Sequence, residues 1–379
     1  MMDKVRKIAV IFVVCVMYAC DGGIIYNVSE TLSDMPVIEV YIDEDEYYTL
    51  LQNKTTKYDA PIKIFYNGQA GTGFIRSSGG GSRLHPRWSY RIELNNDFKV
   101  EGLRLFSLSS QSLDPTMIRT TVVSRLYLLR GIAVFKSKHV FLKINNRDRG
   151  LYLILERIDE EFFNRRNIPV YELYKATLDS DLSFDAPNHP RFTYEKELPE
   201  DNNYTHLFNY INAIDTSNII DIEQNLCDYM DIDDYIQYHA ISSITNNIDA
   251  FKNNYYFYRR SATAPYRFLP WDFDRSFGAV NEVGLAGENT LFNKLSRNEL
   301  MRNKYETEIK YLLENYFRED IIFPIIDSTA KHIRQAYNLD PFLGGGGYNL
   351  DFQVNELKNL ISGRIEFYTG QINNRWDLH

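Results

Sequence analysis

The chain contains little cysteine and histidine, and neither occurs in a metal-binding pattern. Its 379 residues include three cysteines and seven histidines. The cysteines form no spaced pair, and no two histidines lie at the spacing of a zinc motif, so a zinc site is not expected. Stabilising disulfides are not expected either, because a chain of this length can bury a large hydrophobic core.

Basic residues are outnumbered by acidic ones. The chain has 42 lysines and arginines against 51 aspartates and glutamates, which gives a formal net charge of −9. Nucleic-acid binding depends on basic contacts to phosphate, so this balance argues against a nucleic-acid partner. The sequence also lacks internal repeats, heptads and a Gly-x-Ser-x-Gly motif. Solenoids, coiled coils and serine hydrolases with a nucleophile elbow are therefore not favoured.

The apolar run near the N-terminus, Ile8 to Val16, is too short to span a bilayer as a stable helix. Basic residues precede it and Ala19-Cys20 follows it, a pattern typical of a cleaved bacterial lipoprotein signal peptide. A plain signal peptide cut at another position is the alternative. The favoured interpretation makes residues 1–19 the signal peptide and Cys20 the lipidated new N-terminus.

Lipidation at Cys20 would anchor the protein in a membrane of the cell envelope, outside the cytoplasm. Residues 20–35 are polar and turn-rich, and we expect them to tether the lipid to the folded part. Removal of the signal peptide also removes Cys15, which leaves Cys227 as the only free thiol. No internal disulfide can then form.

Tyrosine and phenylalanine are abundant, at 28 and 23 residues. Aromatic side chains bury large areas, so packing in cores and interfaces is the simplest interpretation. The alternative is a sugar-binding cleft lined by aromatic residues, although no spaced motif marks one. A glycan therefore stays an open alternative as a partner.

Alternation of apolar and polar residues predicts a series of strands in the first part of the chain. Asn67-Gly68 is typical of a hairpin turn, and Asn145-Asn146 joins two further apolar segments. The sheet is expected to be mostly antiparallel. The predicted strands are residues 37–42, 62–66, 90–94, 138–144 and 151–155.

Helices are expected mainly after residue 159. One earlier helix is predicted to have Asp114 as its N-cap and Pro115 in its first turn, and to continue to Leu129. Residues 176–203 are rich in Asp, Pro and Asn, which predicts an exposed insertion rather than core. The later helices are predicted at residues 204–214, 231–246, 297–316, 320–337 and 352–370.

Two polar segments carry the most informative pattern in the chain. Asp249 precedes Asn254 by five residues, just before an aromatic strand, and Asp272 and Asp274 follow an apolar strand. Being two residues apart in an extended segment, Asp272 and Asp274 point to one side, as shared metal binding requires. Phosphoryl transfer needs an aspartate to accept a hydroxyl proton and an asparagine and an aspartate to hold magnesium. Capping of turns is the alternative role for these aspartates.

At these residues the sequence resembles the spore-coat kinase family, the CotH-type proteins, which are atypical secreted kinases. The resemblance runs from about residue 60 to residue 280. Any one matching block is weak, but five in the right order are fairly specific. The blocks are residues 79–83 with 86–92, residues 114–119, residues 145–156, residues 173–175, and the segments around Asp249 and Asp272.

The resemblance implies an α+β, two-lobed protein-kinase-like fold. Residues 36–158 would form an N-lobe made of an antiparallel sheet with one helix. Residues 159–379 would form a mostly helical C-lobe that carries the catalytic and metal loops. The implied activity is transfer of the ATP γ-phosphate to a hydroxyl of a protein substrate with Mg²⁺.

The resemblance also implies roles for the motif residues. Asp249 would be the catalytic base, and Asn254, Asp272 and Asp274 would hold magnesium. The remaining assignments concern the nucleotide, and they are Ser82, Arg87, Arg91, Glu156 and Lys175.

The nucleotide assignments rest on weaker patterns. Ser82 ends a glycine-rich segment, where backbone amides can approach a phosphate closely. Arg87 or Arg91 would neutralise phosphate charge, and Lys175 would reach a phosphate or else pair with an acidic neighbour. Glu156 lies where a kinase chain crosses between lobes, and the backbone there would hold the nucleobase. The alternative for Glu156 is an exposed carboxylate at a strand end.

The chain departs from the family at one position of this site. The family commonly has two lysines after the proline at this point, whereas this chain has Arg87 and Trp88. The planar guanidinium of arginine does not replace an ammonium point charge. The alternative function is therefore a catalytically weak or inactive kinase-fold surface lipoprotein that binds a protein or a glycan.

Replacing Cys20 with alanine should release the protein from the membrane fraction. A bacterial lipoprotein carries several acyl chains on its N-terminal cysteine, which suffices for stable anchoring where a single chain is marginal. Fractionation of cells that express wild type or Cys20→Ala, followed by immunoblotting, measures the distribution. Equal retention of both proteins in the membrane fraction would show that the lipoprotein interpretation is wrong.

Overall fold

The computed structural model describes residues 35–53, 57–79, 85–95, 97–278 and 283–373 of the chain. The signal peptide, Cys20 and Ser82 lie outside these described residues, so their predicted roles stay predictions. Within the described ranges, no helix is both long enough and apolar enough to cross a membrane. The described residues form two sheets and a set of helices, in agreement with the predicted α+β class.

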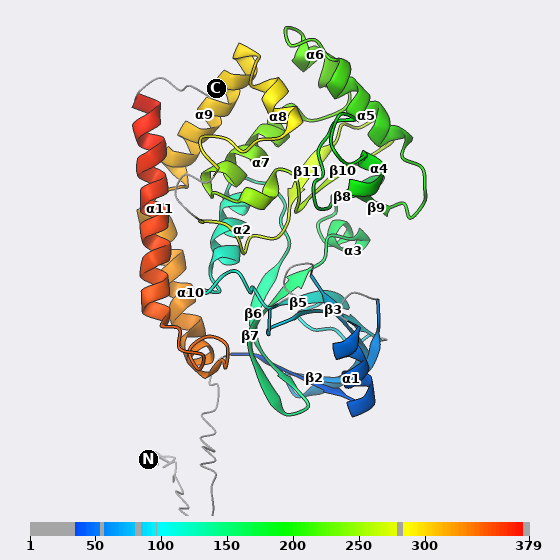
Figure 1. The fold of residues 1–379 in the computed structure, drawn as a ribbon, viewed down its shortest axis with the longest axis vertical. Coiled ribbons are helices and arrows are strands. Elements are labelled where there is room, and N and C mark those ends of the chain that lie inside the picture. The colour runs from blue at the N-terminus through cyan, green and yellow to red at the C-terminus, as the bar shows by residue number, and fades with distance from the viewer. Residues whose placement is uncertain (1–34, 54–56, 80–84, 96, 279–282, 374–379) are drawn as a thin grey trace, which may run out of the picture. The chain divides into compact units, whose positions relative to one another are not determined.

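The first sheet closes into a barrel, which the sequence did not predict (Figure 1). Neighbouring strands are antiparallel except β1 and β6, whose parallel pairing places Val37 opposite Phe141 and closes the barrel. Local alternation cannot reveal this closure, because it joins strands that are far apart in the sequence. The strands are β1 (Val37–Ile42), β2 (Ala60–Tyr66), β3 (Gln69–Ser78), β4 (Ser89–Leu94), β5 (Leu105–Ser109), β6 (Ser137–Ile144) and β7 (Arg147–Glu156).

Both predicted hairpins are confirmed. β2 and β3 are joined at Asn67-Gly68, whose φ angles are 48° and 75°. β6 and β7 are joined at Asn145-Asn146, whose φ angles are 50° and 60°. A two-residue type I′ turn requires positive φ at both central residues, and glycine and asparagine tolerate this conformation best.

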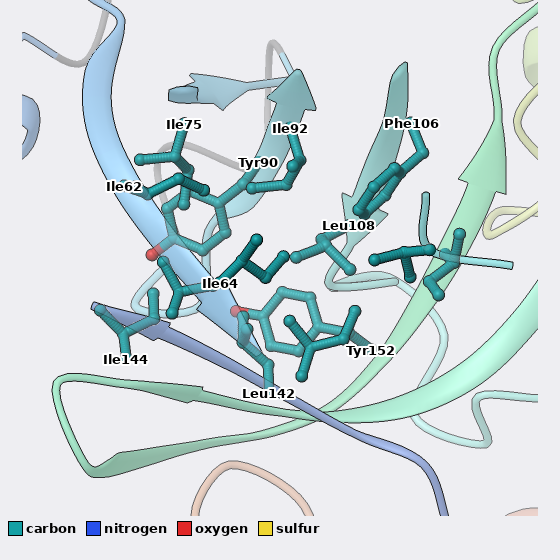
Figure 2. Packing of buried hydrophobic residues seen from close by; sticks show 14 of the residues in the cluster. Ile62, Ile64, Ile75, Tyr90, Ile92, Phe106, Leu108, Leu142, Ile144 and Tyr152 are labelled. Carbon is teal, nitrogen blue, oxygen red and sulfur yellow. The ribbon is translucent and has the colours of Figure 1, made fainter. Parts of the chain in front are cut away.

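The core of the barrel is built from alternate residues of its strands (Figure 2). In β2, Ile62 and Ile64 are buried, whereas Lys63 between them is exposed. Tyr90 from β4 and Tyr152 from β7 stack inside with ring centroids 6.3 Å apart. The apolar alternation in the sequence therefore marks the inward face of the barrel.

The barrel part of the chain contains two helices rather than the single helix expected. Helix α1 (Glu44–Gln52) was not predicted, although Asp43 caps it by accepting the amide of Asp45 at 3.0 Å. Helix α2 (Arg119–Leu129) begins later than predicted. Asp114 lies before it in a turn and accepts the amide of Arg119 at 2.9 Å. Figure 1 shows α2 beside α10.

The second sheet has the strand order β11-β10-β8-β9. The prediction that residues 176–203 form an exposed insertion is wrong, because they contribute α4 (Pro190–Thr193) and β9, and Leu182 is buried. Polar residues here satisfy backbone groups, as when Asp181 accepts the amide of Thr290 at 3.0 Å. The strands are β8 (Glu172–Ala176), β9 (Tyr194–Leu198), β10 (Tyr255–Arg259) and β11 (Arg267–Pro270).

The helices predicted after residue 203 are all present, with ends that shift by a few residues. They are α5 (Thr205–Thr216), α7 (Ile232–Ile244), α9 (Glu299–Asn315), α10 (Glu319–Leu339) and α11 (Leu350–Asn373). The structure adds elements too short to show helical periodicity. These are α3 (Glu160–Asn164), α6 (Ile222–Leu226), the 3₁₀ turn η2 (Ile248–Ala250) and α8 (Thr290–Leu295).

Asp340 joins the end of α10 to the barrel. Its carboxylate is fully buried and accepts the amides of Leu151 at 2.6 Å and Phe342 at 2.7 Å. Asp340 Oδ2 also lies 3.1 Å from Arg87 Nη2 in an ion pair. Gly150 is needed beside it, because a Cβ at that position would lie 2.2 Å from Asp340 Oδ2 and its φ is +93°.

Replacing Asp340 with alanine should lower the free energy of unfolding by about 3–5 kcal/mol, because Arg87 would be left as an uncompensated buried charge. Urea unfolding followed by circular dichroism measures the loss. The control is Asp351→Ala, which breaks an exposed ion pair with Arg334 at 2.6 Å and should change stability little. Similar losses of unfolding free energy in both variants would show that burial of the Arg87–Asp340 ion pair does not make it more important than an exposed pair.

Candidate functional site

The pairing of β10 with β11 brings two of the predicted metal ligands together. Tyr255 lies opposite Pro270 in the antiparallel register. The amide of Trp271 donates to the carbonyl oxygen of Asn254 at 3.1 Å. Asn254 immediately before β10 and Asp272 shortly after β11 therefore lie at the same end of the second sheet.

Asn254 and Asp272 share an unusual backbone conformation. Their φ angles are 54° and 57°, and Phe277 a few residues later has a φ of 55°. Residues other than glycine seldom adopt this left-handed region, and asparagine and aspartate do so most readily. Each such residue costs on the order of 1–3 kcal/mol, and they cluster at functional sites. The surrounding structure must therefore hold these segments in place.

Asp249 lies in η2, the turn between α7 and β10. The hydroxyl of Tyr238 donates to the carbonyl oxygen of Ala250 at 2.6 Å, which holds this turn against α7. Arg275 Nη1 donates to Asp249 Oδ1 at 2.9 Å, and 24% of the Asp249 side chain is exposed. Asp249 is thus tied to the segment that carries the other predicted site aspartates, and it stays accessible to solvent.

Four aspartates come close enough to affect one another, and we call Asp114, Asp249, Asp272 and Asp274 the carboxylate group. Burial raises the pKa of Asp272 to about 6, and the charge of Asp249 adds to this rise. Burial also raises the pKa of Asp274, with further contributions from Asp272, Asp114 and Asp249. Arg119 opposes the rise in the pKa of Asp274 and donates from Nη1 to its carbonyl oxygen at 3.3 Å.

Asp114 and Arg119 are parts of the site that the sequence did not assign to it. Asp114 is fully buried, and Thr116 donates to its Oδ1 from the hydroxyl at 2.5 Å. The sequence indicated only that Asp114 begins a helix. The segment is one of the blocks that resemble the CotH-type proteins, but a position in the chain cannot reveal which distant residues a side chain contacts.

The oxygen atoms of this site suit a magnesium ion. Carboxylate and amide oxygens are the hard ligands that magnesium prefers, and a divalent cation would relieve the repulsion within the carboxylate group. Asn247 adds a buried Oδ1 without a hydrogen-bond partner among the described residues, and its Nδ2 lies 3.5 Å from the carbonyl oxygen of Asp272. The predicted ligands Asn254, Asp272 and Asp274 therefore fit the ion chemically.

In the described part of the chain, no three His, Cys, Asp or Glu side chains are arranged closely enough to hold a metal ion. The assignment of Asn254, Asp272 and Asp274 as ligands therefore stays a prediction.

Three basic side chains lie close enough to Glu197 to affect its pKa, and we call Arg91, Arg157 and Lys175 the basic group. Lys175 on β8 opposes the rise in the pKa of Asp272. Burial lowers the pKa of Arg91 on β4, and the positive charge of Arg157 adds to this decrease. Burial raises the pKa of Glu197 on β9, and all three cations oppose that rise.

Arg157 is a member of this group that the sequence did not identify. Its Nε is buried and has no hydrogen-bond partner among the described residues. Arg91 donates a hydrogen bond to Glu93 at 3.3 Å, and Lys175 forms a longer ion pair with Glu195 at 3.8 Å. In the sequence, Arg157 directly follows Glu156, where the resemblance places the crossing between the lobes. This position is the feature that could have identified Arg157.

The side chain of Glu156 has a structural role. It is fully buried, and its carboxylate accepts Arg165 Nε at 2.8 Å, Arg166 Nη2 at 2.6 Å and the amide of Lys136 at 2.8 Å. The alternative of an exposed carboxylate at a strand end is wrong. Because the carboxylate is fully bonded, the nucleotide prediction at Glu156 applies only to the backbone.

Arg87 is also committed to the fold. Its side chain is buried, pairs with Asp340 at 3.1 Å and lies over the ring of Tyr152 at 4.9 Å from the centroid. This placement argues against the predicted role of Arg87 in neutralising phosphate. Arg91 and Lys175, which were predicted for the same role, do belong to the basic group.

Replacing Asp272 with asparagine should stabilise the protein above about pH 6 and not below about pH 4. Folding raises the pKa of Asp272 from 3.8 to about 6. Between these values the folded state binds more protons than the unfolded state, so stability falls as the pH rises. Asparagine accepts the left-handed backbone and removes the charge, so the gain near neutral pH should be on the order of 1–3 kcal/mol.

Urea unfolding at a series of pH values measures this gain. The matched control is Asp179→Asn, because Asp179 is exposed and has a left-handed φ of 62°. The control should show no gain that depends on pH in this way. A gain in Asp272→Asn of the same size at acid and neutral pH would contradict the electrostatic account.

Comparisons with known proteins agree with the resemblance seen in the sequence. The CotH kinase protein family model matches residues 75–368. The inner spore coat protein H of Bacillus subtilis (strain 168) is 23% identical over 350 residues, which covers 88% of this chain and 97% of that protein.

Two solved structures show weaker similarity, and their TM-scores are too low to support an argument. The Helicobacter pylori proinflammatory kinase CtkA is 12% identical, with a TM-score of 0.31, over 75% of this chain and 94% of that chain. The Shewanella oneidensis MR-1 toxin–antitoxin complex of HipA, HipB and operator DNA is 14% identical, with a TM-score of 0.40, over 90% and 74%. The family model spans more than half of the sequence, and the protein belongs to the CotH kinase family.

Proposed function

We propose that this CotH-family protein transfers the γ-phosphate of ATP to a hydroxyl group of a protein substrate with Mg²⁺. The observation that carries the proposal is the placement of Lys175 beside the predicted metal ligands: Lys175 lies opposite Tyr256, two residues after Asn254, and its charge opposes the rise in the pKa of Asp272. Phosphoryl transfer depends on these parts, because metal ligands, phosphate-neutralising cations and a base must act on one nucleotide. Membership of the CotH kinase family supports the same chemistry.

The carboxylate group supplies the base and the metal ligands in this proposal. Asp249 accepts the proton of the attacking hydroxyl, and its ion pair with Arg275 at 2.9 Å orients the carboxylate. Asn254, Asp272 and Asp274 hold magnesium, which when bound neutralises charge on the transferring phosphoryl group. Burial and the charge of Asp249 raise the pKa of Asp272 to about 6, and a bound cation would oppose this rise and favour the ionised carboxylate.

The basic group neutralises the phosphates of the nucleotide. Lys175 supplies a point charge beside the metal ligands. Arg91 and Arg157 supply guanidinium groups, which bind phosphate oxygens in a bidentate way. Arg157 takes the role that the sequence assigned to Arg87, because Arg87 is buried in its pair with Asp340.

A second candidate function is binding of a protein or a glycan without efficient catalysis. The observation that favours it is the commitment of Arg87 to Asp340, because this chain lacks the lysine pair that the family commonly has at that point. For both candidates we propose a lipoprotein anchored through Cys20 in the cell envelope, outside the cytoplasm.

Replacing Asp249 with asparagine should abolish most phosphoryl transfer and spare nucleotide binding. Asparagine keeps the shape of the side chain and removes the base, so transfer should fall on the order of 10²- to 10⁴-fold. Asp272→Asn should instead weaken both magnesium-dependent ATP binding and transfer. Melting shifts with ATP, in the presence and absence of Mg²⁺, measure binding, and mass shifts of an acceptor protein measure transfer.

The control is Asp327→Asn, because Asp327 is exposed on α10 and pairs with Lys358. It should leave binding and transfer unchanged. An undiminished transfer rate in Asp249→Asn would overturn the catalytic assignment. Wild type that binds ATP with Mg²⁺ but transfers phosphate to no acceptor would favour the second candidate, as would a melting shift with a glycan and none with a nucleotide.

A further inference from the structure

A large cavity lies outside the carboxylate and basic groups. It has a volume of about 770 Å³, within the range of small-molecule binding sites. Its lining comes from α2, α10, the segment from Val134 into β6, the arginines after α3, and residues near Leu103 and on β7. We call it the α2 cavity. It includes none of the residues assigned above to the catalytic base, the metal or the phosphates.

The α2 cavity has an apolar surface and a basic one. The apolar residues that line it are Leu103, Leu128, Val134, Phe135, Ile154 and Ile325. The charged residues that line it are Arg125, Lys136, Lys138, Arg165, Arg166 and Glu101. Five of the six charges are positive, in a protein whose formal net charge is −9. The lining of the cavity is therefore mainly positive, although the chain as a whole is negatively charged.

Some of these positive charges are not neutralised by the protein. Arg165 and Arg166 pair with Glu156, and Lys138 pairs with Glu101 at 2.8 Å. The side chains of Arg125 and Lys136 are exposed and form no ion pair among the described residues. An anion that entered the cavity would therefore find two uncompensated cations.

A buried hydroxyl group also lacks a partner at this cavity. Ser124 on α2 lines it, is 7% exposed, and its Oγ has no hydrogen-bond partner among the described residues. An unsatisfied buried hydroxyl costs on the order of 1–3 kcal/mol. The hydroxyl is therefore an unsatisfied polar group within the wall of the α2 cavity.

The wall of the α2 cavity touches the segment that carries Asp272 and Asp274. Phe135 lines the cavity, and its ring lies 4.8 Å from Trp271 and 5.2 Å from Phe273 between centroids. Tyr127 on α2 stacks on Phe273 from another direction at 5.6 Å. Phe273 lies between Asp272 and Asp274 in the sequence. A ligand that moves Phe135 or α2 therefore displaces the neighbours of both aspartates.

We propose that the α2 cavity binds a small anionic amphiphile, with an oxyanion head near Arg125 and Lys136 and an apolar body inside, and that binding alters the Asp272–Asp274 segment. The mixed lining favours this class over a purely polar anion, because the apolar residues would gain nothing from inorganic phosphate. The proposed effect on the Asp272–Asp274 segment rests on the proposed function, whereas the proposed binding of the ligand does not depend on it.

Binding can be tested on the full chain with dodecyl phosphate below its micelle concentration. Calorimetry should show saturable binding of one molecule per chain. The double variant Arg125→Glu/Lys136→Glu should bind at least about tenfold more weakly, because two attractive charges become repulsive. The matched control is Lys57→Glu/Lys310→Glu, which reverses two exposed charges that do not line the cavity and should bind as wild type does.

Two further probes decide the ligand class. Dodecyl maltoside, which has no charge, and inorganic phosphate, which has no apolar body, should both bind much more weakly than dodecyl phosphate. Equal binding of dodecyl maltoside would overturn the need for an anion, and equal binding of inorganic phosphate would overturn the need for an apolar body. Equal binding of dodecyl phosphate to both double variants would show that the site lies elsewhere.

Coupling of the α2 cavity to the Asp272–Asp274 segment is measured by the fluorescence of Trp271. Subtracting the fluorescence of the Trp271→Phe variant isolates this signal. Saturation with dodecyl phosphate should change this fluorescence in wild type, and it should change the affinity for ATP with Mg²⁺ about fivefold or more. Saturable binding without any change in Trp271 would overturn the coupling. Failure of wild type to bind ATP would instead count against the proposed function and leave the binding and fluorescence tests intact.

Discussion

The antiparallel pairing of β10 with β11 is the interaction on which the site depends. Its register places Asn254 and Asp272 at one end of the sheet, and the pairing of β10 with β8 places Lys175 opposite Tyr256. Strand β10 therefore lies between β11, which leads to the predicted magnesium ligand Asp272, and β8, which carries Lys175. A slip of one residue in either ladder would turn every side chain to the opposite face and separate these groups.

Aromatic packing holds this sheet in register. Phe257 and Phe268 are directly opposed in β10 and β11, and both are buried. Tyr238 on α7 packs against Phe268 at 5.6 Å between centroids and uses its hydroxyl to hold the turn that carries Asp249. The interpretation of the tyrosines as packing residues is confirmed for those in the core, such as Tyr238, whose ring is buried while its hydroxyl bonds to the backbone.

The site itself works against folding. Asp272 and Asp274 have pKa values raised by burial and by other carboxylates, and two of the residues involved adopt left-handed backbone. Such costs persist only where the surroundings are stable enough to enforce them. Here the enforcement comes from the contacts of the Phe273 ring with Tyr127 and Phe135, and from the hydrogen bond of Tyr238 to the turn that carries Asp249. A bound cation would reduce the repulsion between these carboxylates and so stabilise the folded state.

The sequence by itself determined the features that depend on near neighbours. Asn67-Gly68 specifies its hairpin through its backbone preferences. The spacing of Asp249, Asn254 and Asp272 predicts a phosphotransfer site, and the roles of these residues stay predictions. Only the tertiary structure decided the closure of the barrel, the burial of Arg87 and Glu156, and the place of Arg157 in the basic group. The reason is physical: turn and helix signals act within a few residues, whereas the partner of a charge is chosen by which distant strands and helices pack together, and local pattern carries no record of that choice.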